Sequence, residues 1–158
     1  MAKINLNDHG MAVLAQPNEA ELRKLAEAGV KTVINLRNDG EDAMPMSVKT
    51  EGKVCERLGM DYVSLPVSMR PAAEGGADEK LAIAFEMVLT AAREAGPTAV
   101  HCKLGQRAGA MVLIALARHQ GWDAATAIGE AKRLGLGDAV EPAKLRAYVT
   151  GCLAGPGR

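Results

Sequence analysis

Residue types that handle oxyanions stand close together in the stretch VHCKLGQRAG, residues 100 to 109. A cysteine is a strong nucleophile when it is ionised, and an arginine presents a rigid fork of N–H donors that fits two oxygens. Gly105 lies between Cys102 and Arg107, as expected of a loop that needs a positive φ or a backbone close to its ligand. This spacing indicates a loop that holds a tetraoxyanion against a thiolate.

The elements around this stretch place it at the carboxyl end of a strand. The apolar run TAVHC ends at Cys102, and RAGAMVLIALARHQG, which is apolar nearly all round, predicts a deeply buried helix. Ligands of open parallel sheets collect where strands end, because the helix N-termini there present free N–H groups and partial positive charge. That field stabilises a thiolate, so Cys102 is expected to be nucleophilic, and His101 is expected to fix the loop from behind. The residues expected to bind the substrate are Lys103, Leu104, Gly105, Gln106 and Arg107.

Each residue of the loop also has an ordinary structural explanation. A cysteine after a strand is often a small core hydrophobe, a histidine often serves structure alone, and an arginine at a helix start is commonly solvated. Their combination in a strand, loop and helix favours an active loop. Its catalytic residues are then Cys102, Arg107 and His101.

The rest of the chain alternates helix and strand patterns. Asn18 caps a predicted helix that Gly29 ends, and the β-branched run TVINL follows as a strand. The later predicted elements are helix 47–59, strand 60–67, helix 79–96, strand 98–102, and helices 107–121, 122–135 and 141–153. Because strands separated by helices require parallel crossovers, we expect an α/β fold: a single three-layer domain over residues 1–158, with a mainly parallel sheet of four to five strands flanked by helices. KINL and MAVLA are expected to add an edge strand or a hairpin.

The composition is that of an ordinary soluble domain. Apolar residues make up 48% of the chain, and 19 basic residues balance 19 acidic ones, so no charged surface indicates nucleic acid. The cysteines Cys55, Cys102 and Cys152 are too widely spaced for a disulfide framework or a paired metal site, so we expect neither a metal nor a cofactor. The first ten residues hold no apolar signal core, and no apolar run is long enough to span a bilayer. The expected location is the cytoplasm, without membrane contact.

The loop resembles the phosphate-binding loop of the cysteine-dependent phosphatases, the protein tyrosine and dual-specificity superfamily. Their pattern is His-Cys, five residues, Arg, then Ser or Thr; here four residues separate Cys102 from Arg107, and Ala108 stands at the hydroxyl position. A wider match, from AQPNEAELRKLAEAGVKTVINLRNDGED through LGMDYVSLPV to the cysteine loop, resembles the beta-lactamase-hydrolase-like, phosphatase-like family of bacteria, which shares the shortened loop. The resemblance covers about residues 10 to 150. It implies a protein tyrosine phosphatase-like fold and attack on a phosphoester by Cys102.

The shortened loop is also similar to that of rhodaneses, which carry a persulfide on a cysteine. VINLRNDGEDAMP is not followed by a Gly-His-Ile-Pro-Gly-Ala type segment, which argues against a rhodanese fold. Persulfide transfer needs neither a general acid nor the hydroxyl that Ala108 replaces. Sulfurtransferase chemistry at Cys102 therefore stays open as an alternative.

A phosphatase also needs an acid that protonates the leaving oxygen. The resembling enzymes carry an Asp about 30 residues before the cysteine, where this chain has Ser68, Met69 and Arg70. Asp78 is better explained as a helix N-cap than as an acid. Asp39 lies in a loop that can equally be explained as an ordinary polar turn. The candidate general acids are Glu74, Asp39 and Asp78.

Further positive side chains are candidates for contact with an anionic substrate. Arg37 follows the strand TVINL and is expected at the same sheet edge as Cys102, and Arg70 follows the next strand. For each arginine, the alternative explanation is an ordinary solvated surface residue. The sequence favours a cysteine-dependent phosphatase over a sulfurtransferase or a non-catalytic phosphate-binding relative. Its expected partner is a small phosphorylated or sulfur-bearing substrate or a phosphoprotein, with phosphate or sulfate binding the loop.

Overall fold

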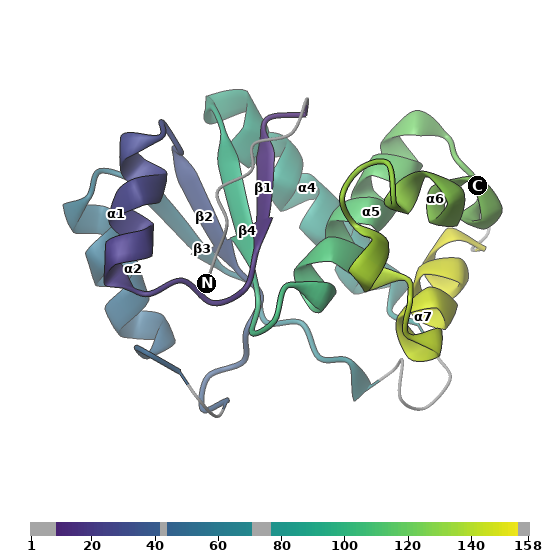
Figure 1. Ribbon diagram of the computed structural model, residues 1–158, viewed down its shortest axis with the longest axis horizontal. Helices are drawn as coiled ribbons and strands as arrows, with labels where there is room; N and C mark the ends of the chain where they lie inside the picture. The colour runs from purple at the N-terminus through teal and green to yellow at the C-terminus, as the bar shows by residue number, and fades with distance from the viewer. Residues whose placement is uncertain (1–8, 42–43, 71–76, 155–158) are drawn as a thin grey trace.

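The computed structural model describes residues 9–41, 44–70 and 77–154 and contains a four-stranded parallel sheet (Figure 1). The strands are β1 (Met11–Leu14), β2 (Thr32–Asn35), β3 (Asp61–Ser64) and β4 (Thr98–His101), in the order β1-β4-β2-β3. β4 lies between β1 and β2, so the residues after its carboxyl end are flanked by the segments that leave both neighbours. The predicted α/β architecture with a parallel sheet is confirmed.

Alternate residues of each strand pack on opposite layers of helices. Ala12, Leu14 and Val33 belong to a core cluster with residues of α1 (Glu19–Glu27) and α2 (Val48–Arg57). Met11, Ile34 and Val100 belong to a larger core cluster with residues of α4 (Glu79–Ala95) and α5 (Gln106–Gln120). This alternation follows from the two-residue period of a strand and gives the three layers that the sequence predicts.

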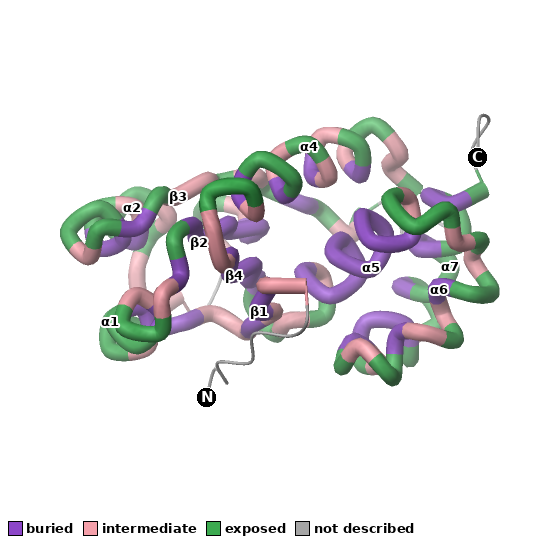
Figure 2. Tube along the Cα trace, turned by 90° about the horizontal axis from the view of Figure 1, so that it is seen from above, coloured by how far each residue is buried: buried purple, intermediate pink, exposed green. Residues whose placement is uncertain are grey.

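α5 is the central helix of the larger layer. Every residue from Ala108 to Ala117 is buried, and Figure 2 shows the helix as a continuous buried segment between α4 and the C-terminal elements. The C-terminal elements are α6 (Ala124–Ala131), the short 3₁₀ helix η1 (Gly137–Ala139) and α7 (Ala143–Leu153). Burial on all sides explains why the sequence of α5 is apolar nearly all round, and it gives the preceding loop a rigid base.

The local predictions agree with the structure within a few residues at the element ends. Asn18 caps α1 in a reciprocal capping box with Glu21, and the Asp78 side chain accepts a hydrogen bond from the Leu81 backbone N–H at the start of α4. MAVL forms the edge strand β1, which pairs in parallel with β4, so the edge strand rather than a hairpin is observed for it. KINL lies outside the described residues.

Candidate active site

The cysteine loop is fixed to the two strands that flank β4. The Leu36 N–H donates to the His101 carbonyl oxygen at 2.9 Å, and the Cys102 N–H donates to the Leu14 carbonyl at 3.4 Å. The Gln16 N–H donates to the Lys103 carbonyl at 3.1 Å. These contacts tie the loop to both neighbouring strands, so its position depends on the sheet itself.

The loop curls around the sulfur of Cys102. The backbone N–H groups of Gly105 and Ala108 point at Sγ, with N to Sγ distances of 3.1 and 3.4 Å. Gly105 has a φ of +94°, in the left-handed region that favours glycine, and a Cβ there would lie 3.5 Å from the Leu14 carbonyl carbon. Of the two reasons that the sequence offers for a glycine at this position, a positive φ or a backbone close to a ligand, the structure shows the positive φ. Two oriented N–H donors and the start of α5 stabilise negative charge on the sulfur.

Other N–H groups of the loop are not used inside the protein. Within the described part of the chain, the backbone N–H groups of Lys103, Leu104, Gln106 and Arg107 make no hydrogen bond to another protein group. Backbone N–H groups at the entrance to a helix are a common anion site, because they carry partial positive charge and their directions are fixed. The loop therefore retains donors for the oxygens of a bound tetraoxyanion.

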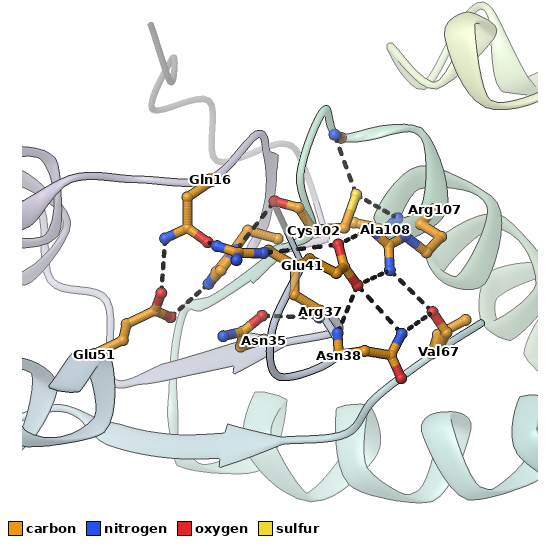
Figure 3. A network of polar contacts seen from close by, with 12 residues as sticks. Gln16, Asn35, Arg37, Asn38, Glu41, Glu51, Val67, Cys102, Arg107 and Ala108 are labelled. Carbon is orange, nitrogen blue, oxygen red and sulfur yellow. Dashed lines mark hydrogen bonds and ion pairs between the residues drawn. The ribbon is translucent and has the colours of Figure 1, made fainter. Parts of the chain in front are cut away.

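Arg107 is held by a carboxylate that sequence reasoning did not single out. Its Nη1 and Nη2 each lie 2.8 Å from one oxygen of Glu41, and Nη1 also donates to the Val67 carbonyl at 3.0 Å. These contacts use three of the five N–H donors of a guanidinium and leave, among the described residues, Nε–H and one Nη2–H along a single edge. That free edge fits two oxygens of a substrate, and the Glu41 contact fixes its direction (Figure 3).

Glu41 and Arg107 each stabilise the charged form of the other. Hydrogen bonds from Arg107 lower the pKa of Glu41 to about 2 against the opposing effect of burial, and the Asn38 N–H, 2.6 Å from Glu41 Oε2, assists. The pKa of Arg107 is raised, first by the hydrogen bond to Glu41, with the nearby Cys102 contributing. Arg107 thus stays charged next to the sulfur.

Stability is expected to fall in acid because of this ion pair. Folding lowers the Glu41 pKa from 4.5 to about 2, so the unfolded chain binds this proton more readily than the folded one. The stabilisation is fully present above about pH 4.5 and is lost as the pH falls through 4.5 toward 2. Urea unfolding at pH 7 and pH 3 measures the loss. Glu41→Gln, which removes the titrating group, should lose less stability over the same interval; an equal loss in both proteins contradicts this assignment.

A buried polar network lies behind the loop. His101 Nδ1 lies 3.3 Å from the Cys102 carbonyl oxygen and its Nε2 lies 2.5 Å from Glu51, and both side chains are fully buried. Gln16 donates to the other Glu51 oxygen at 2.7 Å and accepts a hydrogen bond from Arg37. Figure 3 shows this chain of contacts continuing on the side of Cys102 away from Arg107. His101 therefore lies against the back of the loop, where the sequence expected it.

The open side of the loop is a cavity of about 490 Å³. Cys102, Lys103, Leu104, Gln106 and Arg107 line it from the loop, and Met69, Arg70, Pro142, Lys144 and Leu145 line it from two other segments. Of the residues predicted to contact substrate, Arg70 and Lys103 lie in this cavity. Arg37 does not line it as far as the described residues go; it is 1% exposed and lies beneath the loop, with Nε 3.9 Å from Glu41.

The two described candidates for the general acid, Asp78 and Asp39, lie on different elements of the fold. Asp78 caps α4, where its carboxylate accepts the Leu81 N–H at 3.0 Å, and Asp39 is exposed in the turn after β2. Glu74 lies outside the described residues. Neither described carboxylate is among the residues that line the cavity.

Sequence reasoning missed two acidic residues that shape the site, Glu41 and Glu51. Glu51 had a usable signal: it precedes Val54 and Cys55 by three and four residues, so a helical period puts it on the apolar face of α2, where a carboxylate requires a partner. Glu41 had a weaker signal, because its loop carries several polar residues and nothing local distinguishes it from Asp39.

The other two cysteines differ from Cys102 in their surroundings. Burial raises the pKa of the Cys55 thiol to about 12 and that of the Cys152 thiol to about 11. Neither lines the cavity, and each belongs to the apolar core. Both should be poor nucleophiles in the folded protein.

Selective alkylation follows from this difference. Iodoacetate, a small anion, is expected to modify Cys102 well before Cys55 or Cys152, because only Cys102 combines N–H donors at its sulfur with a cationic cavity. Peptide mass spectrometry after short exposures measures the order of labelling, and inorganic phosphate should slow the reaction at Cys102. Simultaneous labelling of all three thiols in the folded protein would refute this expectation.

Two kinds of feature, a membrane-spanning helix and a metal site, are absent from the described residues. No helix among them is long and apolar enough to cross a membrane. No three His, Cys, Asp or Glu side chains in the described ranges gather in a way that would hold a metal ion.

The chain is similar in sequence to known proteins over nearly its whole length. The family model of the beta-lactamase hydrolase-like protein, phosphatase-like domain, matches residues 5–119. A beta-lactamase hydrolase-like protein of Xylella fastidiosa (strain Temecula1) is 31% identical over 159 residues, which cover 98% of this chain and 35% of that protein. The chain thus spans about a third of the length of this curated relative.

Solved structures of phosphatases share the fold. P. aeruginosa TpbA has a TM-score of 0.69 and 26% identity over 91% of this chain and 81% of its own, and it has also been solved in complex with pTyr. Tk-PTP in its active form has a TM-score of 0.72 over 96% of this chain and 95% of its own; at 24% identity it supports the fold alone. The fold is that of the protein tyrosine phosphatase-like enzymes.

Proposed function

Because the chain belongs to the family of beta-lactamase hydrolase-like, phosphatase-like domains, we propose that it is a cysteine-dependent phosphatase that attacks phosphate monoesters with Cys102. The observation that carries the proposal is the geometry around one sulfur: two backbone N–H groups point at Sγ, and the free edge of Arg107 adjoins it. The first two groups stabilise the sulfur, and the unused loop N–H groups together with Arg107 hold a phosphoryl group within reach of it.

The reaction proceeds in two displacements. The Cys102 thiolate attacks phosphorus, an S–P bond forms, and the P–O bond to the leaving oxygen breaks; the departing alkoxide or phenoxide takes its proton from water. The loop N–H groups and Arg107 bind the three non-bridging oxygens, where charge develops in the transition state. Water then attacks phosphorus, the S–P bond breaks, and inorganic phosphate and the thiolate are released.

The described cavity favours substrates with good leaving groups. No carboxylate is among the described residues that line it, so an acidic phenol, which needs little protonation, should leave faster than an alkyl alcohol. Ala108 places a methyl group where the resembling enzymes carry a hydroxyl that assists the thiolate as it leaves. For aryl esters, hydrolysis of the phosphocysteine is then the slow step.

A paired assay tests this function. The wild-type protein is expected to hydrolyse p-nitrophenyl phosphate and to hydrolyse glycerol phosphate more slowly by about 10²-fold or more, as expected when a proton donor is lacking. Incubation with thiosulfate and cyanide in parallel should give no thiocyanate. Absence of phosphate release from the aryl ester in a folded preparation would overturn the proposal.

Persulfide transfer is the second candidate, and two observations favour it. The described lining residues include no acid, and Ala108 supplies no hydroxyl. Neither group is needed when the Cys102 thiolate attacks the outer sulfur of thiosulfate, the S–S bond breaks, sulfite leaves, and cyanide then takes the sulfur atom as thiocyanate. Thiocyanate formation together with a persulfide on Cys102 would select this chemistry over phosphate hydrolysis.

A further inference from the structure

The cavity beside Cys102 has two walls that do not belong to the cysteine loop. Met69 and Arg70 follow β3, and Pro142, Lys144 and Leu145 come from the start of α7. A phosphoryl group at the loop would therefore leave the remainder of its substrate between these two segments. A volume of about 490 Å³ is in the range that holds a small organic molecule.

The charge of this cavity exceeds what one phosphate group requires. Its lining includes four cationic side chains, Arg70, Lys103, Arg107 and Lys144, and no acidic side chain among the described residues. Only Arg107 is paired, with Glu41; in the described part of the chain the side chains of Arg70, Lys103 and Lys144 form no ion pair. The loop N–H groups and Arg107 suffice for one phosphoryl group, so three cations remain for the rest of the substrate.

The uncharged part of the lining is aliphatic. Met69, Leu104 and Leu145 line the cavity, and Leu104 is 72% exposed at its rim. The four aromatic residues of the chain lie elsewhere: Phe85 and Tyr148 are fully buried, and Trp122 packs against the larger core cluster. Tyr62 hydrogen-bonds to Asn35 and to the Val48 carbonyl. No aromatic side chain lines the cavity in the described part of the chain. A phosphotyrosine ring would have no aromatic face to stack on.

We propose that the substrate is a compact, non-aromatic phosphate ester that carries a second phosphate group, bound by Arg70 and Lys144 on the walls opposite the loop. This inference rests on the proposed function, because it assigns the first phosphate to Cys102 and Arg107. A second phosphate neutralises side chains that otherwise repel one another across the cavity, and the cations raise the local concentration of polyanions. Either a free polyol phosphate or a phosphoinositide headgroup has this chemistry.

Binding to the Cys102→Ser variant tests the inference without turnover. Isothermal titration calorimetry compares inositol 1,4-bisphosphate with inositol 4-phosphate, which lacks only the second phosphate. The bisphosphate is expected to bind at least about tenfold more tightly, as for one added set of charged hydrogen bonds. Lys144→Gln and Arg70→Gln, each added to that variant, should reduce this ratio several-fold. Lys24→Gln makes the same charge change on α1, outside the cavity, and should leave the ratio as it is.

Further measurements distinguish a lipid headgroup from a soluble ester, and distinguish failure of this inference from failure of the proposed function. If dioctanoyl phosphatidylinositol 4-phosphate binds more tightly than free inositol 1,4-bisphosphate, the ligand is a lipid headgroup. If it binds equally or more weakly, the ligand is a soluble ester. Equal affinity for the two inositol phosphates, a ratio that survives both cavity substitutions, or tighter binding of phosphotyrosine overturns the inference. The proposed function fails separately, when wild-type protein releases no phosphate from p-nitrophenyl phosphate.

Discussion

Replacing Cys102 by serine is expected to abolish hydrolysis of p-nitrophenyl phosphate, with kcat/KM falling by at least about 10³-fold. A serine hydroxyl is far less ionised than a thiol, and the N–H donors of Gly105 and Ala108 at Sγ cannot compensate for that difference. Ser is smaller than Cys but keeps the loop contacts of the backbone, so phosphate binding should persist. Steady-state kinetics and calorimetry with inorganic phosphate measure the two effects separately.

Cys55→Ser is the matched control for this substitution. Cys55 is as buried as Cys102, but it lies in the core cluster of α1 and α2 and does not line the cavity. This variant should lose some stability and keep its kcat/KM, which excludes a general effect of losing a buried thiol. Full activity in Cys102→Ser, or an equal loss in both variants, would contradict the role assigned to Cys102.

Replacing Arg107 by lysine is expected to lower kcat/KM by about 10²- to 10³-fold although the charge is kept. Glu41 and the Val67 carbonyl occupy one side of the guanidinium, and the edge with Nε is left for the substrate. A lysine ammonium is a single point with three donors, so it cannot hold Glu41 and present two parallel donors to a phosphoryl group.

Glu41→Gln separates this positioning effect from the charge of Arg107. Glutamine keeps one acceptor for the guanidinium and loses the ion pair, so Arg107 should be less firmly oriented, with kcat falling more than KM changes. Arg107→Lys should weaken the binding of inorganic phosphate, and Glu41→Gln should weaken it less. Unchanged kinetics in Arg107→Lys would show that the fork geometry has no part in turnover.

Much of the fold follows from patterns that lie within a few residues of each other. The capping box of Asn18 and Glu21, the cap at Asp78 and the apolar α5 are local signals, and they position the helices correctly. The strands follow from short β-branched runs, and the parallel order follows from the helices between them. MAVL was the weakest of these patterns, and its place at the sheet edge beside β4 depends on tertiary pairing.

The site was only partly predictable because its contacts join distant positions. The cysteine, glycine and arginine of the loop lie within six residues, so their spacing indicated a common site. Glu41 is 66 positions from Arg107, and Glu51 is 50 positions from His101, and no local pattern specifies either pair. Arg37 emerges at the predicted sheet edge, yet it is buried beneath the loop, since a strand end fixes where a residue begins and not where its long side chain goes.

The proposed function depends on covalent transfer of the phosphoryl group to Cys102, which rapid-quench mass spectrometry can detect. Wild-type protein is mixed with p-nitrophenyl phosphate, stopped in acid within the first turnovers and digested. A phosphoryl adduct is expected on the Cys102 peptide, where it accumulates because Ala108 gives the leaving thiolate no hydroxyl, and no adduct is expected on the Cys55 or Cys152 peptides. Continued release of p-nitrophenol without any adduct on Cys102, in wild-type and in Cys102→Ser alike, would contradict it.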